Sequence, residues 1–139
     1  MKEVPDSMGI IINEQLHLSP KEAFELCKKG AIIIDVREAF MSHIKTFDVP
    51  EILIFPLRTL KDDLKKLPKS KLLIFADATG VKSKPAMEYA SENGLTFIAN
   101  LAGGLVEWER QGLPTITYQR MRVAGHSRCE FVHKDHIGQ

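Results

Sequence analysis

The chain has 139 residues, of which 44% are hydrophobic and 27% are charged, and its 19 basic and 18 acidic side chains leave a formal net charge of +1. This length suits one domain and is too short for two. Nucleic-acid-binding proteins usually carry a clear basic excess, so the balanced charge predicts no nucleic-acid partner. No apolar run approaches the roughly 20 residues of a membrane-spanning helix, so no membrane partner is expected either.

The N-terminal segment combines acidic residues with Pro5 where a secretory signal peptide would have its apolar stretch, so we expect a cytoplasmic protein. The two cysteines, Cys27 and Cys129, are expected to be reduced in that compartment. We interpret residues 1–15 as a loosely held leader, residues 16–115 as the folded domain and residues 116–139 as a C-terminal tail.

The first predicted helix begins at a capping box, Ser19-Pro20-Lys21-Glu22. In this motif the serine hydroxyl accepts a hydrogen bond from the first turn, the glutamate reaches back, and proline fits the first helical position. The helix is expected to end at Gly30. Residues 31–36 form a continuous β-branched run, which is typical of a strand buried on both faces.

The rest of the pattern alternates between strands and helices. Strands are predicted at residues 52–55, 71–76 and 96–100, and helices at residues 57–67, 81–93 and 103–111. This alternation predicts an α/β fold: a single domain with a mostly parallel central sheet of about five strands and helices on both faces. In such sheets function lies in the loops at the carboxyl ends of the strands.

Three motifs lie at these predicted strand ends, and each resembles a motif of the rhodanese-like family. Ile34-Asp35-Val36-Arg37-Glu38 is similar to the family's strand-ending Asp-Val-Arg-Glu. Leu101-Ala102-Gly103-Gly104 with Trp108 and Gly112-Leu113-Pro114 is similar to its Gly-Gly, Trp and Gly-Leu-Pro ending. The third motif has the position and length of the family's active-site loop: Asp77-Ala78-Thr79-Gly80-Val81-Lys82-Ser83.

The resemblance implies sulfur transfer, in which a cysteine thiolate of this loop takes up a sulfane sulfur as a persulfide and passes it to a nucleophile. Backbone N–H groups of the loop and the start of the next helix stabilise the sulfur anion. The family's spacing to Gly80 places Asp77 at the cysteine position and Lys82 where many members have arginine. A carboxylate cannot form a persulfide, but it is an anion that such a loop can hold.

Two interpretations of Asp77 stay open: a general base or nucleophile, and a structural anion that closes an anion-binding loop. We favour the second, because nothing near Asp77 in the sequence supplies a second carboxylate or a set of metal ligands. Lys82 is expected to pair with Asp77 or with a bound anion. Asp35, Arg37 and Glu38 are expected to support the loop through ion pairs and hydrogen bonds.

The two cysteines are predicted to differ. Cys27 lies among apolar residues of the first helix, where a free cysteine behaves as a small hydrophobic side chain. Cys129 lies near Arg128 and histidines, which favour a thiolate, so it is the alternative sulfur acceptor. The tail also holds His126, His133 and His136. If the tail were helical, these ligand types would span about 15 Å, too far for one tetrahedral ion, so no metal site is predicted.

These residues predict a rhodanese-like domain without ordinary thiosulfate sulfurtransferase activity, which acts as a binding or regulatory module with a small anion or a protein as its partner. The alternative is an active sulfurtransferase that uses Cys129. A third hypothesis, phosphatase-like chemistry at Asp77, ranks last because the loop lacks the length and the terminal arginine of those enzymes. No cofactor is implied, and the sequence leaves the oligomeric state open.

Overall fold

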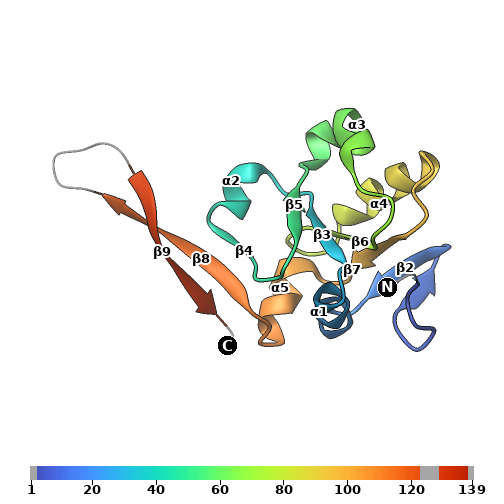
Figure 1. Cartoon of the computed structure of the whole chain (residues 1–139), viewed down its shortest axis with the longest axis horizontal. Helices are drawn as coiled ribbons and strands as arrows, with labels where there is room; N and C mark the ends of the chain where they lie inside the picture. Colours follow the sequence, from blue (N-terminus) through green and yellow to red (C-terminus); the bar gives the residue numbers. More distant parts are fainter. Residues whose placement is uncertain (1–2, 123–128, 138–139) are drawn as a thin grey trace.

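A six-stranded sheet forms the centre of the protein in the computed structural model, which describes residues 3–122 and 129–137, with side chains up to Tyr118 (Figure 1). The strand order is β1-β2-β7-β6-β3-β5. All neighbours in this sheet run parallel except β1 and β2, which are antiparallel. The bounds are β1 (Ile10–Ile12), β2 (Gln15–Leu18), β3 (Ile32–Asp35), β5 (Ile52–Ile54), β6 (Leu73–Ala76) and β7 (Ile98–Leu101). The predicted parallel sheet of about five strands is confirmed, and β1 adds an antiparallel edge.

Helices cover both faces of this sheet, as predicted. In β3 the Ile33 side chain packs into one apolar cluster, whereas Ile32 and Ile34 pack into the other, because successive side chains of a strand point to opposite faces. The first cluster holds residues of α1 (Pro20–Lys28) and α5 (Gly104–Arg110). The second holds residues of α3 (Leu60–Asp63) and α4 (Ser83–Glu92).

The capping box at the start of α1 is present as predicted. The Glu22 N–H donates to Ser19 Oγ at 3.2 Å, and Glu22 Oε1 accepts from the Ser19 N–H at 2.9 Å. Glu22 Oε2 also accepts from the Gly9 N–H at 2.9 Å. These backbone donors lower the pKa of Glu22, and the Gly9 bond ties the N-terminal segment to α1.

The N-terminal segment contains a β-hairpin where the sequence suggests a loosely held leader. β1 pairs with β2 in the register Ile10↔His17 to Ile12↔Gln15. Asn13 and Glu14 connect the strands with φ of 51° and 64°, the backbone that tight hairpin turns require. The sequence offered no Asn-Gly or Asp-Gly signal at this turn, so the hairpin was missed.

The predicted helix at residues 57–67 is shorter and irregular. α3 is flanked by two 3-10 turns, Leu57–Thr59 and Leu64–Lys66. None of the three segments has a side-chain cap, and Leu67 has extended backbone, as expected for a residue before a proline. Leu60, Leu64 and Leu67 are nevertheless buried, so the leucine spacing correctly identified the apolar face.

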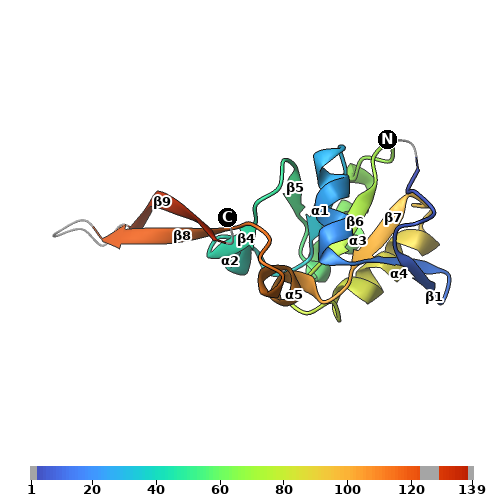
Figure 2. The ribbon, with the colours of Figure 1, turned by 90° about the horizontal axis from the view of Figure 1, so that it is seen from below.

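The C-terminal segment belongs to a second sheet. After α2 (Ala39–Ser42), β4 (Lys45–Phe47) pairs with β8 (Thr115–Arg122), which pairs with β9 (Cys129–Ile137), and both pairings are antiparallel. The β8–β9 hairpin projects away from the six-stranded sheet in both views (Figure 1; Figure 2). Most of the segment interpreted as a tail is therefore strand.

In the part of the chain that the structure describes, no helix is long and apolar enough to cross a membrane.

Trp108 is the largest buried side chain, and its removal should test the packing of α5. Its ring contacts Phe24 and Phe47 edge-on, with centroids 5.6 Å and 5.1 Å away, and its indole N–H donates to the Pro114 carbonyl at 2.8 Å. We expect Trp108→Ala to lower the free energy of unfolding by about 3–5 kcal/mol, since it leaves a large cavity.

Urea denaturation followed by circular dichroism measures this loss. The matched control is Val106→Ala in the same helix, where the side chain is 51% exposed, and the expected change there is within about 0.5 kcal/mol. Similar losses for the two variants would contradict the packing role of Trp108.

Candidate functional site

The loop of residues 77–83 connects the carboxyl end of β6 to α4, and Asp77 is buried within it, 3% exposed. Asp77 Oδ1 accepts a hydrogen bond from the Gly80 N–H, and Oδ2 accepts one from the Lys82 N–H at 2.8 Å. The carboxylate therefore turns inward and occupies the backbone donors of its own loop.

The start of α5 holds this loop from the other side. The Leu105 N–H donates to the Asp77 carbonyl and the Val106 N–H to the Ala78 carbonyl, each at 2.9 Å. Gly104 makes the approach possible: its φ is +59°, and a Cβ there would lie 2.6 Å from the Ala78 carbonyl oxygen. A Cβ at Gly80 would similarly lie 2.8 Å from the Gly103 nitrogen. Two motifs distant in sequence are thus in direct backbone contact.

Lys82 contacts Asp77 through its backbone and not through the expected side-chain charge pair. It contributes its backbone N–H, and among the described residues no ion pair joins its ammonium group to a carboxylate. The side chain is exposed. The helical turn directs the Lys82 N–H at Asp77, while its side chain borders the cavity described below.

Asp35 and Arg37 form a buried ion pair beside the loop. Arg37 Nη2 lies 2.8 Å from Asp35 Oδ2, and its Nε donates to Asp35 Oδ1 at 3.0 Å. Ser42 Oγ donates to Asp35 Oδ2 at 2.6 Å, and Arg37 Nη2 also donates to the Lys45 carbonyl at 2.9 Å. Both charges are hydrogen-bonded on several sides, so this group fixes the chain between β3 and β4.

A cavity of about 710 Å³ lies between the loop and the segment that follows β3. Arg37, Arg58 and Lys82 supply its cationic groups, and Glu38 pairs with Arg58 at 3.1 Å on the exposed side. The apolar lining consists of Val36, Met41, Leu57, Ala78 and Val81. The structure thus places Arg37 and Glu38 beside the loop. Among the described residues, their side-chain ion pairs and hydrogen bonds go to Asp35, Lys45 and Arg58 instead of to the loop as expected. Sequence analysis missed Arg58, Met41 and Leu57, because no motif marks them.

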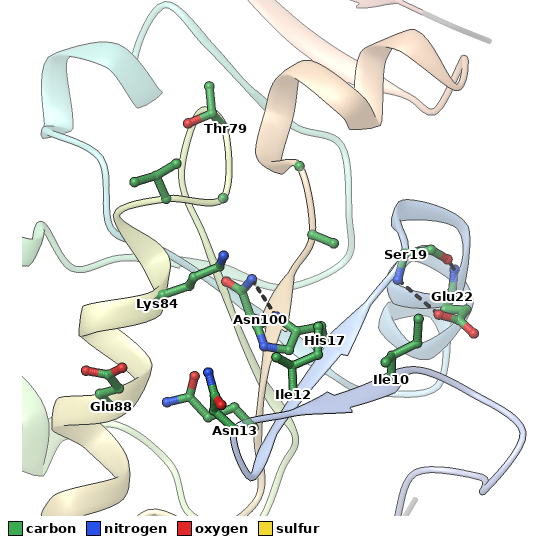
Figure 3. A pocket seen from close by; sticks show the side chains of 15 residues that line it. Ile10, Ile12, Asn13, His17, Ser19, Glu22, Thr79, Lys84, Glu88 and Asn100 are labelled. Atoms are coloured by element: carbon green, nitrogen blue, oxygen red, sulfur yellow. Dashed lines mark hydrogen bonds between the residues drawn. The ribbon is translucent and has the colours of Figure 1, made fainter.

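A second cavity, of about 410 Å³, lies on the other side of the loop (Figure 3). His17 of β2 and the buried Asn100 of β7 line it, and Asn100 Nδ2 lies 3.1 Å from His17 Nδ1. Burial, and then the positive charge of Lys84, lower the pKa of His17, against a hydrogen bond to the Ile12 backbone. Sequence analysis missed both residues. The available signal was a polar Asn100 at the end of an apolar strand.

The cysteines do not join either cavity's described lining. Cys27 is buried in α1, as predicted, and desolvation raises the pKa of its thiol to about 12. Cys129 begins β9, and its side chain lies outside the described residues, as do those of His133 and His136 and the whole of His126. Residues 129–137 form strand β9, so this part of the tail does not form the helix considered for it.

No group of three or more His, Cys, Asp or Glu side chains within the described part of the chain could hold a metal ion.

Comparison with known proteins identifies the family. The family model described as "Rhodanese-like domain" matches residues 19–111. The chain belongs to the rhodanese-like domain family.

Two sequence relatives are named for sulfur transfer. A protein of Allochromatium vinosum named "Sulfurtransferase" is 26% identical over 88 residues, which cover 63% of this chain and 80% of that protein. A "Probable adenylyltransferase/sulfurtransferase MoeZ" of Mycobacterium tuberculosis is 27% identical over 99 residues, 70% of this chain but only 25% of that protein.

Solved structures agree on the fold. A rhodanese-related protein from Thermoplasma volcanium has a TM-score of 0.65 at 26% identity, covering 71% of this chain and 95% of that one. The polysulfide-sulfur transferase of Wolinella succinogenes, solved as a homodimer, has a TM-score of 0.63 at 25% identity, covering 82% and 83%. The fold prediction is therefore confirmed.

The contact between Gly104 and the loop can be tested by adding one methyl group. We expect Gly104→Ala to lower the free energy of unfolding by about 2–4 kcal/mol, because overpacking adds to the strain of a positive φ. The amide resonances of Gly80 and Lys82 should also shift, because the loop must move.

The matched control is Gly94→Ala. Gly94 also has a positive φ, +92°, but a Cβ there meets nothing within 4 Å, so only the backbone strain of about 1–2 kcal/mol is expected. Equal losses in urea denaturation, with unchanged Gly80 and Lys82 amides, would contradict a tight contact at Gly104.

Proposed function

We propose that this rhodanese-like domain lacks ordinary thiosulfate sulfurtransferase activity and acts as a binding or regulatory module for a small anion or a protein in the cytoplasm. The observation that carries the proposal is the inward-facing Asp77 carboxylate, which accepts from the Gly80 and Lys82 N–H groups. The spacing from Asp77 to Gly80 matches that of the family's cysteine, so the aspartate holds the donors that a sulfur anion would use.

The chemistry of the carboxylate supports this proposal. In thiosulfate transfer, a thiolate attacks the outer sulfur, the sulfur–sulfur bond breaks, and sulfite leaves with the bonding electrons. A carboxylate oxygen forms no persulfide. Cys27 does not replace it, because its thiol is buried in α1 with a pKa raised to about 12. β9, where Cys129 lies, belongs to the hairpin that projects away from β6.

The cavity beside the loop supports an anion as ligand. Arg58 is 72% exposed in its pair with Glu38, and such exposed pairs contribute little, so the guanidinium can turn to a ligand. The Lys82 ammonium borders the same space. Arg37, in contrast, is committed to Asp35. Arg58 and Lys82 are therefore the groups we assign to ligand binding.

The activity prediction is tested by exchanging the residue at position 77. We expect no turnover of the unaltered protein in the thiosulfate:cyanide assay. Asp77→Cys should place a thiol beside the Gly80 and Lys82 donors, which favour the thiolate, and mass spectrometry should then detect one added sulfur atom after incubation with thiosulfate. Asp77→Asn is the matched control and should gain nothing.

Robust turnover by the unaltered protein would overturn the proposal. If Cys129→Ser then abolished that turnover, the alternative sulfurtransferase mechanism would hold instead. Failure of folded Asp77→Cys to take up sulfur would show that the loop does not stabilise a thiolate.

The binding prediction is tested with thiosulfate and sulfate as probes in calorimetric titrations. We expect Arg58→Gln and Lys82→Gln each to raise Kd about fivefold, the effect of losing about 1 kcal/mol from an exposed charge interaction. Lys69→Gln is the control, because Lys69 borders a separate small cavity. Equal effects of all three variants would assign the binding to net charge and contradict a site beside the loop.

A further inference from the structure

A chain of polar side chains leads from the buried Asp77 to His17 at the second cavity. Ser83 Oγ lies 3.4 Å from Asp77 Oδ1 and is hydrogen-bonded to Asn100 Oδ1. Asn100 Nδ2 in turn lies 3.1 Å from His17 Nδ1. Ser83 is fully buried, and Asn100 is 1% exposed. The loop after β6, helix α4 and strands β7 and β2 thus contribute one group each.

The donors and acceptors of this chain fix its direction when the neutral His17 ring carries its proton on Nε2 and accepts at Nδ1. Asn100 Oδ1 can only accept, so Ser83 must give it its one hydroxyl proton. The Asn100 amide then donates to His17 Nδ1. Ser83 has no second proton, so its 3.4 Å contact with Asp77 Oδ1 is only the weaker arm of a shared hydrogen bond. In this state Asp77 is held by the Gly80 and Lys82 N–H groups.

Protonation of His17 would reverse the two hydrogen bonds that Asn100 makes, one to His17 and one to Ser83. The imidazolium carries a proton on both nitrogens, so Nδ1 becomes a donor and the Asn100 amide must turn its oxygen toward it. The Asn100 nitrogen then donates to Ser83 Oγ. The Ser83 hydroxyl proton is released from Asn100 and can be donated to Asp77. No heavy atom has to leave its place except by rotation of one buried amide.

We propose that His17 is a proton-sensing site whose protonation reverses the hydrogen bonds of Asn100 and frees the Ser83 hydroxyl to donate wholly to the Asp77 carboxylate. The inference goes beyond the proposed function, because it concerns the chain's own groups and holds whether or not the loop binds an external anion.

The second cavity gives solvent access to His17. In Figure 3, His17, Asn100 and Lys84 lie together within it, and a dashed line joins Asn100 to His17. The charged groups that line the same cavity are Lys84 and Glu88 of α4 and Glu22 of α1. Burial and the positive charge of Lys84 lower the pKa of His17 below the ordinary histidine value of 6.5. The neutral chain is therefore present near pH 7, and the reversed chain forms as the pH falls below the His17 pKa.

The experiment is a nuclear magnetic resonance titration of the full chain across the His17 midpoint. We expect the Gly80 and Lys82 amide resonances to shift in a step whose midpoint equals that of the His17 ring. His17→Gln should abolish the step while Lys84, Glu88 and Glu22 keep their charges. Asn100→Ala should leave the His17 ring titrating but remove the step at Gly80 and Lys82, because the connection is cut.

Two further variants complete the test. Ser83→Ala removes only the last hydroxyl, and it should also abolish the step if Asn100→Ala proves too unstable to study. His43→Gln, at an exposed histidine on α2's C-terminal side, is the matched control and should leave the step intact. A step that persists in folded His17→Gln or Ser83→Ala, or that is absent from the unaltered protein, would overturn the proposal. Neither result depends on the sulfur-transfer assay.

Discussion

The backbone contact between the start of α5 and the loop of residues 77–83 is the constraint on which the site depends. Two N–H groups of α5 hold the carbonyls of Asp77 and Ala78, and Gly104 provides the space for them. A loop at the end of a parallel strand is otherwise free to adopt many conformations, at a cost of about 1–2 kcal/mol of entropy for each residue that is ordered. Because the contact fixes the loop, its N–H groups point inward and can hold an anion.

Asp77 supplies that anion from within the chain. A loop that stabilises a negative charge has unsatisfied donors unless a ligand, a thiolate or a carboxylate accepts from them, and a buried donor without a partner costs about 1–3 kcal/mol. The inward carboxylate removes this cost permanently. The neighbouring cavity keeps its cationic border, since the side chains of Arg58 and Lys82 form no ion pair with Asp77. Structural closure of the loop and anion binding beside it are therefore compatible.

Sequence analysis identified those parts of the site that local patterns determine. The capping box of α1, the β-branched strand β3 and the loop between β6 and α4 were all located from short stretches of residues. The β1–β2 hairpin was missed because Asn13-Glu14 lacks the usual turn residues. A hydrogen bond from the Lys82 backbone N–H takes the place of the charge pair expected between Asp77 and Lys82. The reason is that the turn into α4 points this N–H at the carboxylate.

The sequence by itself located α1, β3, β5, β6, α4, β7 and α5, the apolar residues that these elements bury and the position of Asp77 at a strand end, because these follow from periodicity and from residues near in the chain. Only the tertiary structure decided that Arg58 borders the loop's cavity and that Ser83, Asn100 and His17 form one polar chain to Asp77. Asn100 and His17 are 83 positions apart. They meet because β2 pairs with β7, and strand pairing between distant segments depends on the packing of the whole sheet.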